Sequence, residues 1–268
     1  MFNQDPNRPD RPDRYQSPGA PQGSPWGSPA PGSVTPNTLG AGVRTGAVPR
    51  EGFLTLSFIW MFLALLVSAG AAYLVMNNVA VIQKVSGAFI VLIIVELVLV
   101  VAITGLINRI GAIPALALLF VYAAINGLVL GVIVYAYAHS AVGVQGVVSA
   151  FAGASAIFGG AAVYGVATKR DLTGLGGILF MGLIGLLVVM LVQMFLFPGS
   201  GIASLLIGIV GVLIFTGLTA FDVQRIQKGA MPGIKDRESA SVIGALALYL
   251  DFVNLFLFML RIFGSSRN

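Results

Sequence analysis

The sequence predicts an all-α membrane protein with seven transmembrane helices, and two observations support this fold class. Of the 268 residues, 57% are hydrophobic and 9% are charged, whereas soluble domains carry about 25% charged residues. The apolar residues form runs of about 20 without alternation, which fits spanning helices and does not fit the strands of a β-barrel. The chain contains no cysteine, so disulfides and thiolate chemistry are excluded.

Seven apolar segments are expected to form the spans, because each is close to the length that crosses the hydrocarbon layer. They are 53–76, 87–107, 112–138, 142–167, 176–197, 202–223 and 241–263. The connections are short and polar or rich in glycine and proline, which favours antiparallel neighbours in an up-and-down bundle.

The first 50 residues differ sharply from the rest of the chain. They are rich in Pro, Gly, Ser, Asp and Arg and cannot bury enough apolar surface to offset the entropy of ordering. We therefore predict a disordered tail at 1–50 and a membrane domain at 51–268. The basic run 8–14 could bind a partner or anionic lipid, or could simply be solvated. No cleavable signal peptide is expected.

The distribution of basic residues predicts the orientation. Twelve of the 15 Lys and Arg residues lie in the tail or in loops on its side, and only Lys84, Arg261 and Arg267 lie on the other side. Basic residues concentrate on the cytoplasmic side of membrane proteins. The N-terminus is therefore expected in the cytoplasm and the C-terminus outside. The net charge of +5 follows from topology and indicates no nucleic-acid partner.

Two carboxylates in the last two predicted spans carry the functional hypothesis. Asp222 lies near the cytoplasmic end of its span, and Asp251 lies about 15 Å along the last one at 1.5 Å per residue. Ionisable groups inside a membrane usually mark functional sites, although Asp222 could merely meet water and Asp251 could be a structural hydrogen-bonding group. If adjacent helices bring them together, like charges favour sharing one proton. The ionised pair would repel itself and attract cations, with oxygen ligands suited to calcium.

Four further polar residues could support this pair. Glu96 lies midway along the second predicted span, where it could line an ion path or, when protonated, form a hydrogen bond between helices. Arg109 closes that span on the cytoplasmic side and could pair with the aspartates or only set topology. Asn254 lies three positions after the last aspartate and could order it. Arg261 could offset carboxylate charge or extend to the far interface.

No motif indicates an enzyme. The sequence contains no metal-ligand cluster, no phosphate-binding or dinucleotide-binding glycine pattern, and no Ser or Cys triad candidate. Asn126 and Gln193 are single polar residues that are expected to hold helices together. We therefore expect no enzymatic activity and no cofactor, with calcium as a permeant ion.

Two motifs resemble those of the Bax-inhibitor-like membrane proteins (the transmembrane BAX inhibitor motif family), whose bacterial members include calcium-leak proteins. They are Phe-Asp-Val-Gln-Arg-Ile at 221–226 and Leu-Tyr-Leu-Asp-Phe-Val-Asn-Leu-Phe-Leu at 248–257, followed by Leu-Arg-Ile-Phe-Gly at 260–264. The resemblance covers about residues 50–268 and implies a bacterial plasma membrane as the location. It implies six helices around a central seventh and a pH-sensitive calcium leak, with Asp222 and Asp251 as the sensing pair. Family residues that match Glu96 and, near the end of the same helix, Arg109 are implied as supporting residues. Phe221 replaces the tyrosine that usually precedes the first aspartate.

The leading hypothesis is therefore a cation leak gated by protonation of an aspartate pair. One alternative is a regulator that transports nothing and binds membrane proteases or stress-pathway partners, which family members are linked to. A remote alternative is an intramembrane aspartyl protease, but the Gly-x-Gly-Asp pattern of presenilin-type enzymes does not precede Asp251.

Overall fold

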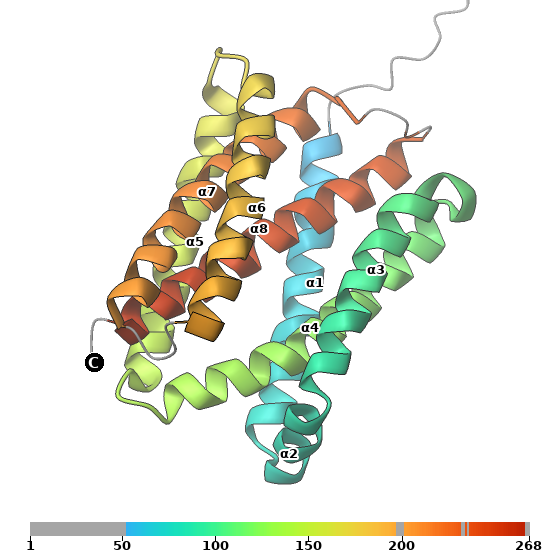
Figure 1. Cartoon of the computed structure of the whole chain (residues 1–268). Coiled ribbons are helices and arrows are strands. Elements are labelled where there is room, and N and C mark those ends of the chain that lie inside the picture. The colour runs from blue at the N-terminus through green and yellow to red at the C-terminus, as the bar shows by residue number, and fades with distance from the viewer. Residues whose placement is uncertain (1–51, 197–200, 232–233, 235, 266–268) are drawn as a thin grey trace, which may run out of the picture. The chain divides into compact units, whose positions relative to one another are not determined.

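The computed structural model describes residues 52–196, 201–231, 234 and 236–265 (Figure 1). Within these ranges it contains eight α-helices and no strand. The predicted tail, 1–50, lies outside the described residues. The helices are α1 (Phe53–Met76), α2 (Val79–Gly87), α3 (Phe89–Ile110), α4 (Ala112–Ala138), α5 (Gly143–Ala167), α6 (Thr173–Leu196), α7 (Gly201–Gln227) and α8 (Arg237–Ser265).

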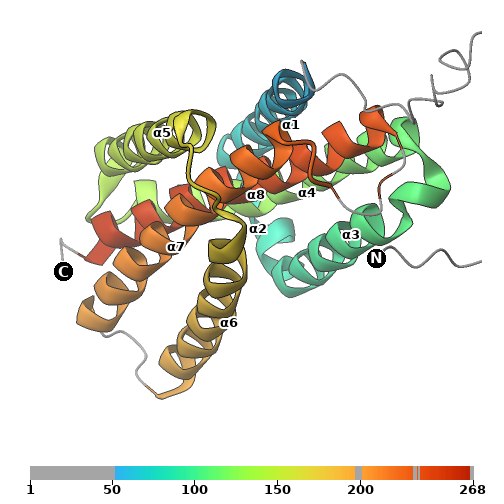
Figure 2. The same ribbon diagram turned by 90° about the horizontal axis from the view of Figure 1, so that it is seen from above.

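Seven of these helices, all except α2, are long and apolar enough to cross a membrane. This confirms the predicted fold class. The helix α8 is the central one, since 67% of its most apolar stretch is buried, compared with 11% in α3 and α6. It packs against α1, α3, α4, α5 and α7, whereas α6 packs mainly on α7. Figure 2 shows α8 running between α1 and α5 on one side and α3 and α6 on the other.

The bundle is tight where small residues let backbones approach. A Cβ atom added at Gly127 of α4 would lie 2.7 Å from the Cα atom of Ser68 on α1, and one added at Gly165 of α5 would lie 3.2 Å from the Cα atom of Ala220 on α7. Hydrophobic burial does not drive helices together in lipid, so this close approach contributes much of the packing.

The helix boundaries agree with the predicted spans to within a few residues, and three differences matter. The short helix α2 fills a stretch expected to be a loop, and the Asn78 side chain caps it by accepting hydrogen bonds from the amides of Ala80 and Val81 at 3.1 and 3.3 Å. The helix α7 continues past residue 223 to Gln227, which places Arg225 on the helix. The helix α8 starts at residue 237 because the Asp236 carboxylate caps it, accepting from the Ser239 amide at 2.7 Å.

The two ends of the bundle can be named by their residues. Gly52, before α1, lies beside the Arg237 side chain at the start of α8, and α7 finishes at this end, which we call the Asp222 end. Gly201 at the start of α7 lies near the Ser265 carbonyl, and Gly264 lies against Tyr137 near the end of α4. We call this second end the Arg261 end.

Candidate functional site

Asp251 lies in the middle of α8 and is 4% exposed. Its Oδ2 atom is buried and accepts no hydrogen bond from any residue that the structure describes. The hydrogen-bonding neighbour of this carboxyl is the buried hydroxyl of Thr219 on α7. Thr219 donates its single hydroxyl hydrogen to the Phe215 carbonyl at 2.7 Å. A hydrogen bond between Thr219 and Asp251 then needs a proton on the Asp251 carboxyl group, which donates to the Thr219 oxygen.

Asp222 lies on α7, one turn after Thr219, and faces a cavity. Its Oδ1 atom is 3.8 Å from Nη1 of Arg225, which is an ion pair too long to be a hydrogen bond. The cavity has a volume of about 370 Å³ and lies between α3, α7 and α8. Asn108 of α3 and Leu250 of α8 line it together with Asp222 and Arg225. A residue with a carboxylate, one with a guanidinium and one with an amide thus line the same opening of the bundle.

The structure brings the two predicted aspartates into one site. The helices α7 and α8 pack together along their length, and the charge of Asp222 acts on Asp251. Asp251 lies deeper, and Asp222 lies at the cavity wall. Within the described ranges there is no group of three or more His, Cys, Asp or Glu residues that could hold a metal ion. Two carboxyl groups supply fewer than the six to eight oxygen ligands that calcium takes when tightly bound.

Arg109 and Asn254 do not occupy their predicted positions beside the pair. Arg109 is exposed on the last turn of α3, and the cation beside Asp222 is Arg225 of the same helix as the aspartate. Asn254 donates from Nδ2 to the Leu250 carbonyl at 2.8 Å, one turn earlier in α8. A side-chain amide on a helix reaches the carbonyl four residues back more easily than a side chain three residues back.

Glu96 lies in a chain of hydrogen bonds that joins four helices. Asn126 of α4 donates from Nδ2 to Oε2 of Glu96 on α3 at 3.2 Å. The hydroxyl of Tyr249 on α8 donates to Oδ1 of Asn126 at 2.8 Å. The Tyr249 oxygen is also 2.6 Å from Oγ of Ser68 on α1, and that Oγ lies 2.7 Å from the carbonyl oxygen of Ala123. The chain runs through the bundle core beside α8.

The number of hydrogens limits how these four contacts can form together. With an ionised Glu96, Asn126 donates to it, Tyr249 donates to Asn126 and Ser68 donates to Tyr249, so Ser68 has no hydrogen left for the Ala123 carbonyl. With a protonated Glu96 and the Asn126 amide flipped, Glu96 donates to Asn126, and Asn126 donates to Tyr249. Tyr249 then donates to Ser68, and Ser68 donates to the Ala123 carbonyl. All four contacts are then hydrogen bonds. This favours the second of the two roles predicted for Glu96, a protonated glutamic acid bonded between helices.

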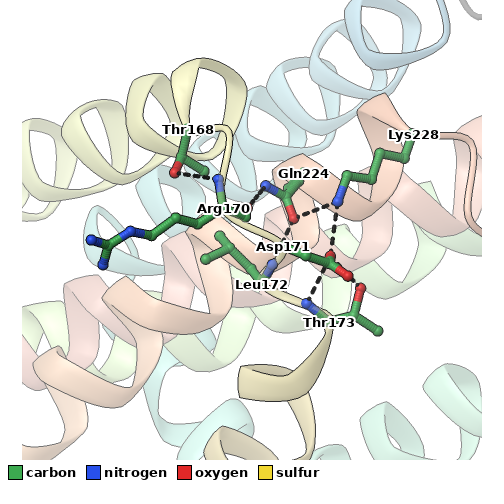
Figure 3. Close-up of polar contacts among 7 residues, drawn as sticks. All are labelled: Thr168, Arg170, Asp171, Leu172, Thr173, Gln224 and Lys228. Atoms are coloured by element: carbon green, nitrogen blue, oxygen red, sulfur yellow. Dashed lines mark hydrogen bonds and ion pairs between the residues drawn. The ribbon is translucent and has the colours of Figure 1, made fainter.

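A polar clamp holds the end of α7 on which Asp222 lies (Figure 3). The buried side chain of Gln224 donates to the Arg170 carbonyl at 2.8 Å and accepts from the Leu172 amide at 2.9 Å. Its Oε1 atom also accepts from Nζ of Lys228 at 2.9 Å. The α5–α6 connection is therefore bound to α7 by one side chain, two residues from Asp222.

Asp171 completes this clamp on the surface. Its Oδ1 atom accepts from Nζ of Lys228 at 2.9 Å and from the hydroxyl of Thr173 at 2.7 Å. These hydrogen bonds from Lys228 and Thr173 lower the pKa of Asp171 to about 2. A lowered pKa means that the ion pair stabilises the folded state above the ordinary carboxyl pKa and is lost as the pH falls towards about 2. The clamp is thus intact throughout the physiological pH range.

Arg261 lies at the end of the bundle opposite to Asp222. Its Nε atom donates to the Ser204 carbonyl at 3.2 Å, and its Nη2 atom donates to Oε1 of Gln193. The structure therefore gives Arg261 no contact with the aspartates, and it supports Gln193 as a residue that joins helices.

Several residues of the site were not singled out from the sequence. Arg225 could have been, because it follows Asp222 by three positions on a helix. Ser68 and Thr219 are polar residues in apolar runs, which is a weak signal for contacts between helices. Nothing in the sequence pairs Tyr249 with Asn126, because only packing of α8 against α4 brings them together.

Comparison with known proteins matches the whole membrane domain. A family model described as "Inhibitor of apoptosis-promoting Bax1" (Bax1-I) matches residues 50–268. An uncharacterized protein of Borreliella burgdorferi is 41% identical over 82% of this chain and 94% of its own length, and one of Deinococcus radiodurans is 39% identical over 81% and 91%.

A third relative, the inner membrane protein YbhL of Escherichia coli K12, is 36% identical over 82% of this chain and 95% of its own length. None of these three names states an enzymatic activity. The matches cover the aspartate pair, the cavity and the polar chain through Glu96, and the helical architecture agrees with a membrane protein. The chain belongs to the Bax inhibitor family of membrane proteins.

Proposed function

We propose that this protein is a pH-sensitive cation leak, with calcium as the permeant ion, gated by protonation of Asp222 and Asp251. The observation that carries the proposal is the position of Asp222 at the wall of the cavity between α3, α7 and α8, with Asp251 buried behind it. A carboxylate at an opening can attract a cation, and a second carboxyl behind it can hold the proton that decides whether the cation enters.

The gating step follows from the charges of the two groups. When one proton is shared, the pair has a single negative charge, which Arg225 at 3.8 Å offsets in part. When that proton leaves, two negative charges face each other in the low-dielectric interior and repel. Separation of α7 from α8, or entry of a divalent cation, relieves this repulsion. We therefore expect the leak to rise with pH.

The basic residues indicate the side of the membrane to which the Asp222 cavity opens. Their concentration in the tail and on the loops at the Asp222 end supports a cytoplasmic location for this end. The cavity would then open to the cytoplasm, and cytoplasmic pH would control the flux. Two carboxyl groups without further acidic ligands suit transient passage of calcium better than storage.

Flux measurements in proteoliposomes test the proposal. For the wild-type chain, calcium flux should rise about tenfold or more between about pH 6 and about pH 8, since one pH unit changes the proton occupancy of a titrating group up to tenfold. Asp222→Asn and Asp251→Asn should each flatten this profile, because an amide cannot titrate. Glu238→Gln is the matched control. It removes an exposed carboxylate in the first turn of α8, at the Asp222 end of the bundle, and should leave the pH profile of the flux unchanged.

The same experiment separates the alternatives. Wild-type pH dependence that persists in both asparagine variants would rule out the aspartate pair as the gate. Absence of flux from the pure protein at every pH would favour a regulator that acts on membrane proteases or other partners. Cleavage of a transmembrane substrate that depends on both aspartates would favour the protease hypothesis.

A further inference from the structure

A second cavity lies at the Arg261 end, away from the aspartate pair. Its volume is about 400 Å³, and residues from the ends of α4, α6, α7 and α8 and from the α4–α5 connection line it. The polar lining includes Tyr137, Ser140, Gln193, Ser204, Arg261 and Ser265. These helix ends lie at one end of the membrane domain, where spanning helices leave the hydrocarbon layer and meet lipid headgroups.

The Arg261 guanidinium is held in place within this cavity. It donates from Nε to the backbone carbonyl of Ser204 on α7 and from Nη2 to the side-chain oxygen of Gln193 on α6. Both acceptors are uncharged, and other N–H groups of the guanidinium are left to bind a ligand. The hydroxyl groups of Tyr137 and Ser204 line the same space.

Among the residues that the structure describes, no acidic side chain lines the cavity around Arg261. The sequence contains no Asp or Glu in 97–170, in 172–221 or after residue 251, and these ranges supply all the lining residues. The ion pairs between described residues, Asp222 with Arg225 and Asp171 with Lys228, lie at the opposite end of the bundle. A cation in a membrane segment normally pairs with an anion or a backbone carbonyl, or faces a water-filled cavity, and the described acceptors of Arg261 do not offset its charge.

We propose that the cavity around Arg261 binds a phosphate group, as a counter-ion that the described lining residues do not supply. A guanidinium presents a planar fork of N–H donors that matches two phosphate oxygens, and the hydroxyls of Tyr137 and Ser204 can donate to a third. The phosphate is either that of a phospholipid headgroup or inorganic phosphate. This site is independent of the proposed leak, because it shares no residue with the Asp222 cavity.

The test measures the thermal unfolding midpoint of the full chain in detergent with three additives. They are phosphatidylglycerol, diacylglycerol with the same acyl chains but no phosphate, and inorganic phosphate. A ligand that binds only the folded state raises Tm, and we expect phosphatidylglycerol to raise it by about 3 °C or more above diacylglycerol. An equal rise with inorganic phosphate identifies a free-anion site, and a rise with the lipid alone identifies a headgroup site.

Three variants locate the effect. Arg261→Gln should abolish the rise, and Ser204→Leu should abolish it by filling the cavity, while Arg261 keeps its bonds to the residue 204 backbone and to Gln193. Lys84→Gln is the matched control, since it removes an exposed cation on the same side of the membrane outside the cavity. If Arg261→Gln fails to fold, Arg261→Lys replaces it and should reduce the rise. No rise in the wild type with either phosphate compound, or a full rise in Ser204→Leu, overturns the proposal.

Discussion

Each ionisable side chain inside the bundle has a different local partner, and that partner decides what the residue can do. Asp251 is buried against a hydroxyl, Asp222 lies at a cavity wall near a guanidinium, and Glu96 is bonded to an amide. Among the described residues, the hydrogen-bond acceptors of Arg261 are uncharged. In the sequence these residues all look alike, as ionisable side chains within apolar segments. Their surroundings separate a candidate gate, a hydrogen-bonded core acid and a candidate anion site.

The central residue of the polar chain is Asn126, which gives a prediction at the scale of the residue. Asn126→Leu leaves Glu96 and the Tyr249 hydroxyl buried without their shared partner, so it should lower the free energy of unfolding by about 2 kcal/mol. Glu96→Leu combined with Asn126→Leu should recover part of this loss, because the unpaired acid is then gone. Denaturant titration in detergent measures both.

Asn254→Leu is the matched control for this prediction. Its side-chain bond runs to the Leu250 carbonyl within its own helix, so its loss leaves no group on another helix without a partner. It should cost less than about 1 kcal/mol. If Asn126→Leu costs no more than Asn254→Leu, the polar chain does not stabilise the bundle.

Helices of similar sequence character have different roles in this bundle. The helices α3 and α6 have little buried surface and face outward, whereas α8 is surrounded and carries one member of the aspartate pair and one of the polar chain. The helix α3 supplies both Glu96 and one wall of the Asp222 cavity. A change in how α3 packs would therefore alter both the hydrogen-bonded chain through Glu96 and the Asp222 cavity.

The close approach of α1 and α4 gives a prediction at the scale of the element. Gly127→Ala places a methyl group against the Ser68 backbone, which cannot move without separating the helices. We expect a loss of about 1–3 kcal/mol in the free energy of unfolding. Gly105→Ala is the control, because a Cβ atom there meets nothing within 4 Å. Equal stability of the two variants would contradict a tight α1–α4 contact.

At the scale of the whole molecule, the sites lie at opposite ends of the membrane domain. The aspartate cavity and the Gln224 clamp occupy one end, and the Arg261 cavity occupies the other. The orientation predicted from the basic residues would place the first in contact with the cytoplasm and the second with the outer headgroups. The acidic residues of the described domain lie at the Asp222 end or in the interior, which gives the two ends different electrostatic character.

This orientation can be tested directly because the chain contains no cysteine. A cysteine in place of the exposed His139, between α4 and α5, should react with a membrane-impermeant maleimide in intact cells or right-side-out vesicles. A cysteine in place of the exposed Lys169, between α5 and α6, should react only after permeabilisation. The wild-type chain supplies the unlabelled background, and the reverse labelling pattern would invert the orientation.

Much of the fold followed from the sequence, because each span has the length and composition that a bilayer demands. The spans 53–76 and 112–138 agree with α1 and α4 at both ends. The predicted central place of the last helix is confirmed. The short helix α2 was missed, because its Asn78 cap is a local feature that hydrophobic length does not reveal.

The sequence by itself determined the class of protein and the number of spans, because the hydrophobic length of each segment is a property of the chain alone. It also singled out Asp222 and Asp251 as candidate functional residues, because a charge within an apolar segment is costly. Only the tertiary structure decided the partners of those charges. It placed Arg225 rather than Arg109 beside Asp222, Thr219 rather than Asn254 beside Asp251, and Asn126 beside Glu96. Contacts between helices depend on how each helix is rotated against its neighbour, and spacing within a single helix carries no information about that rotation.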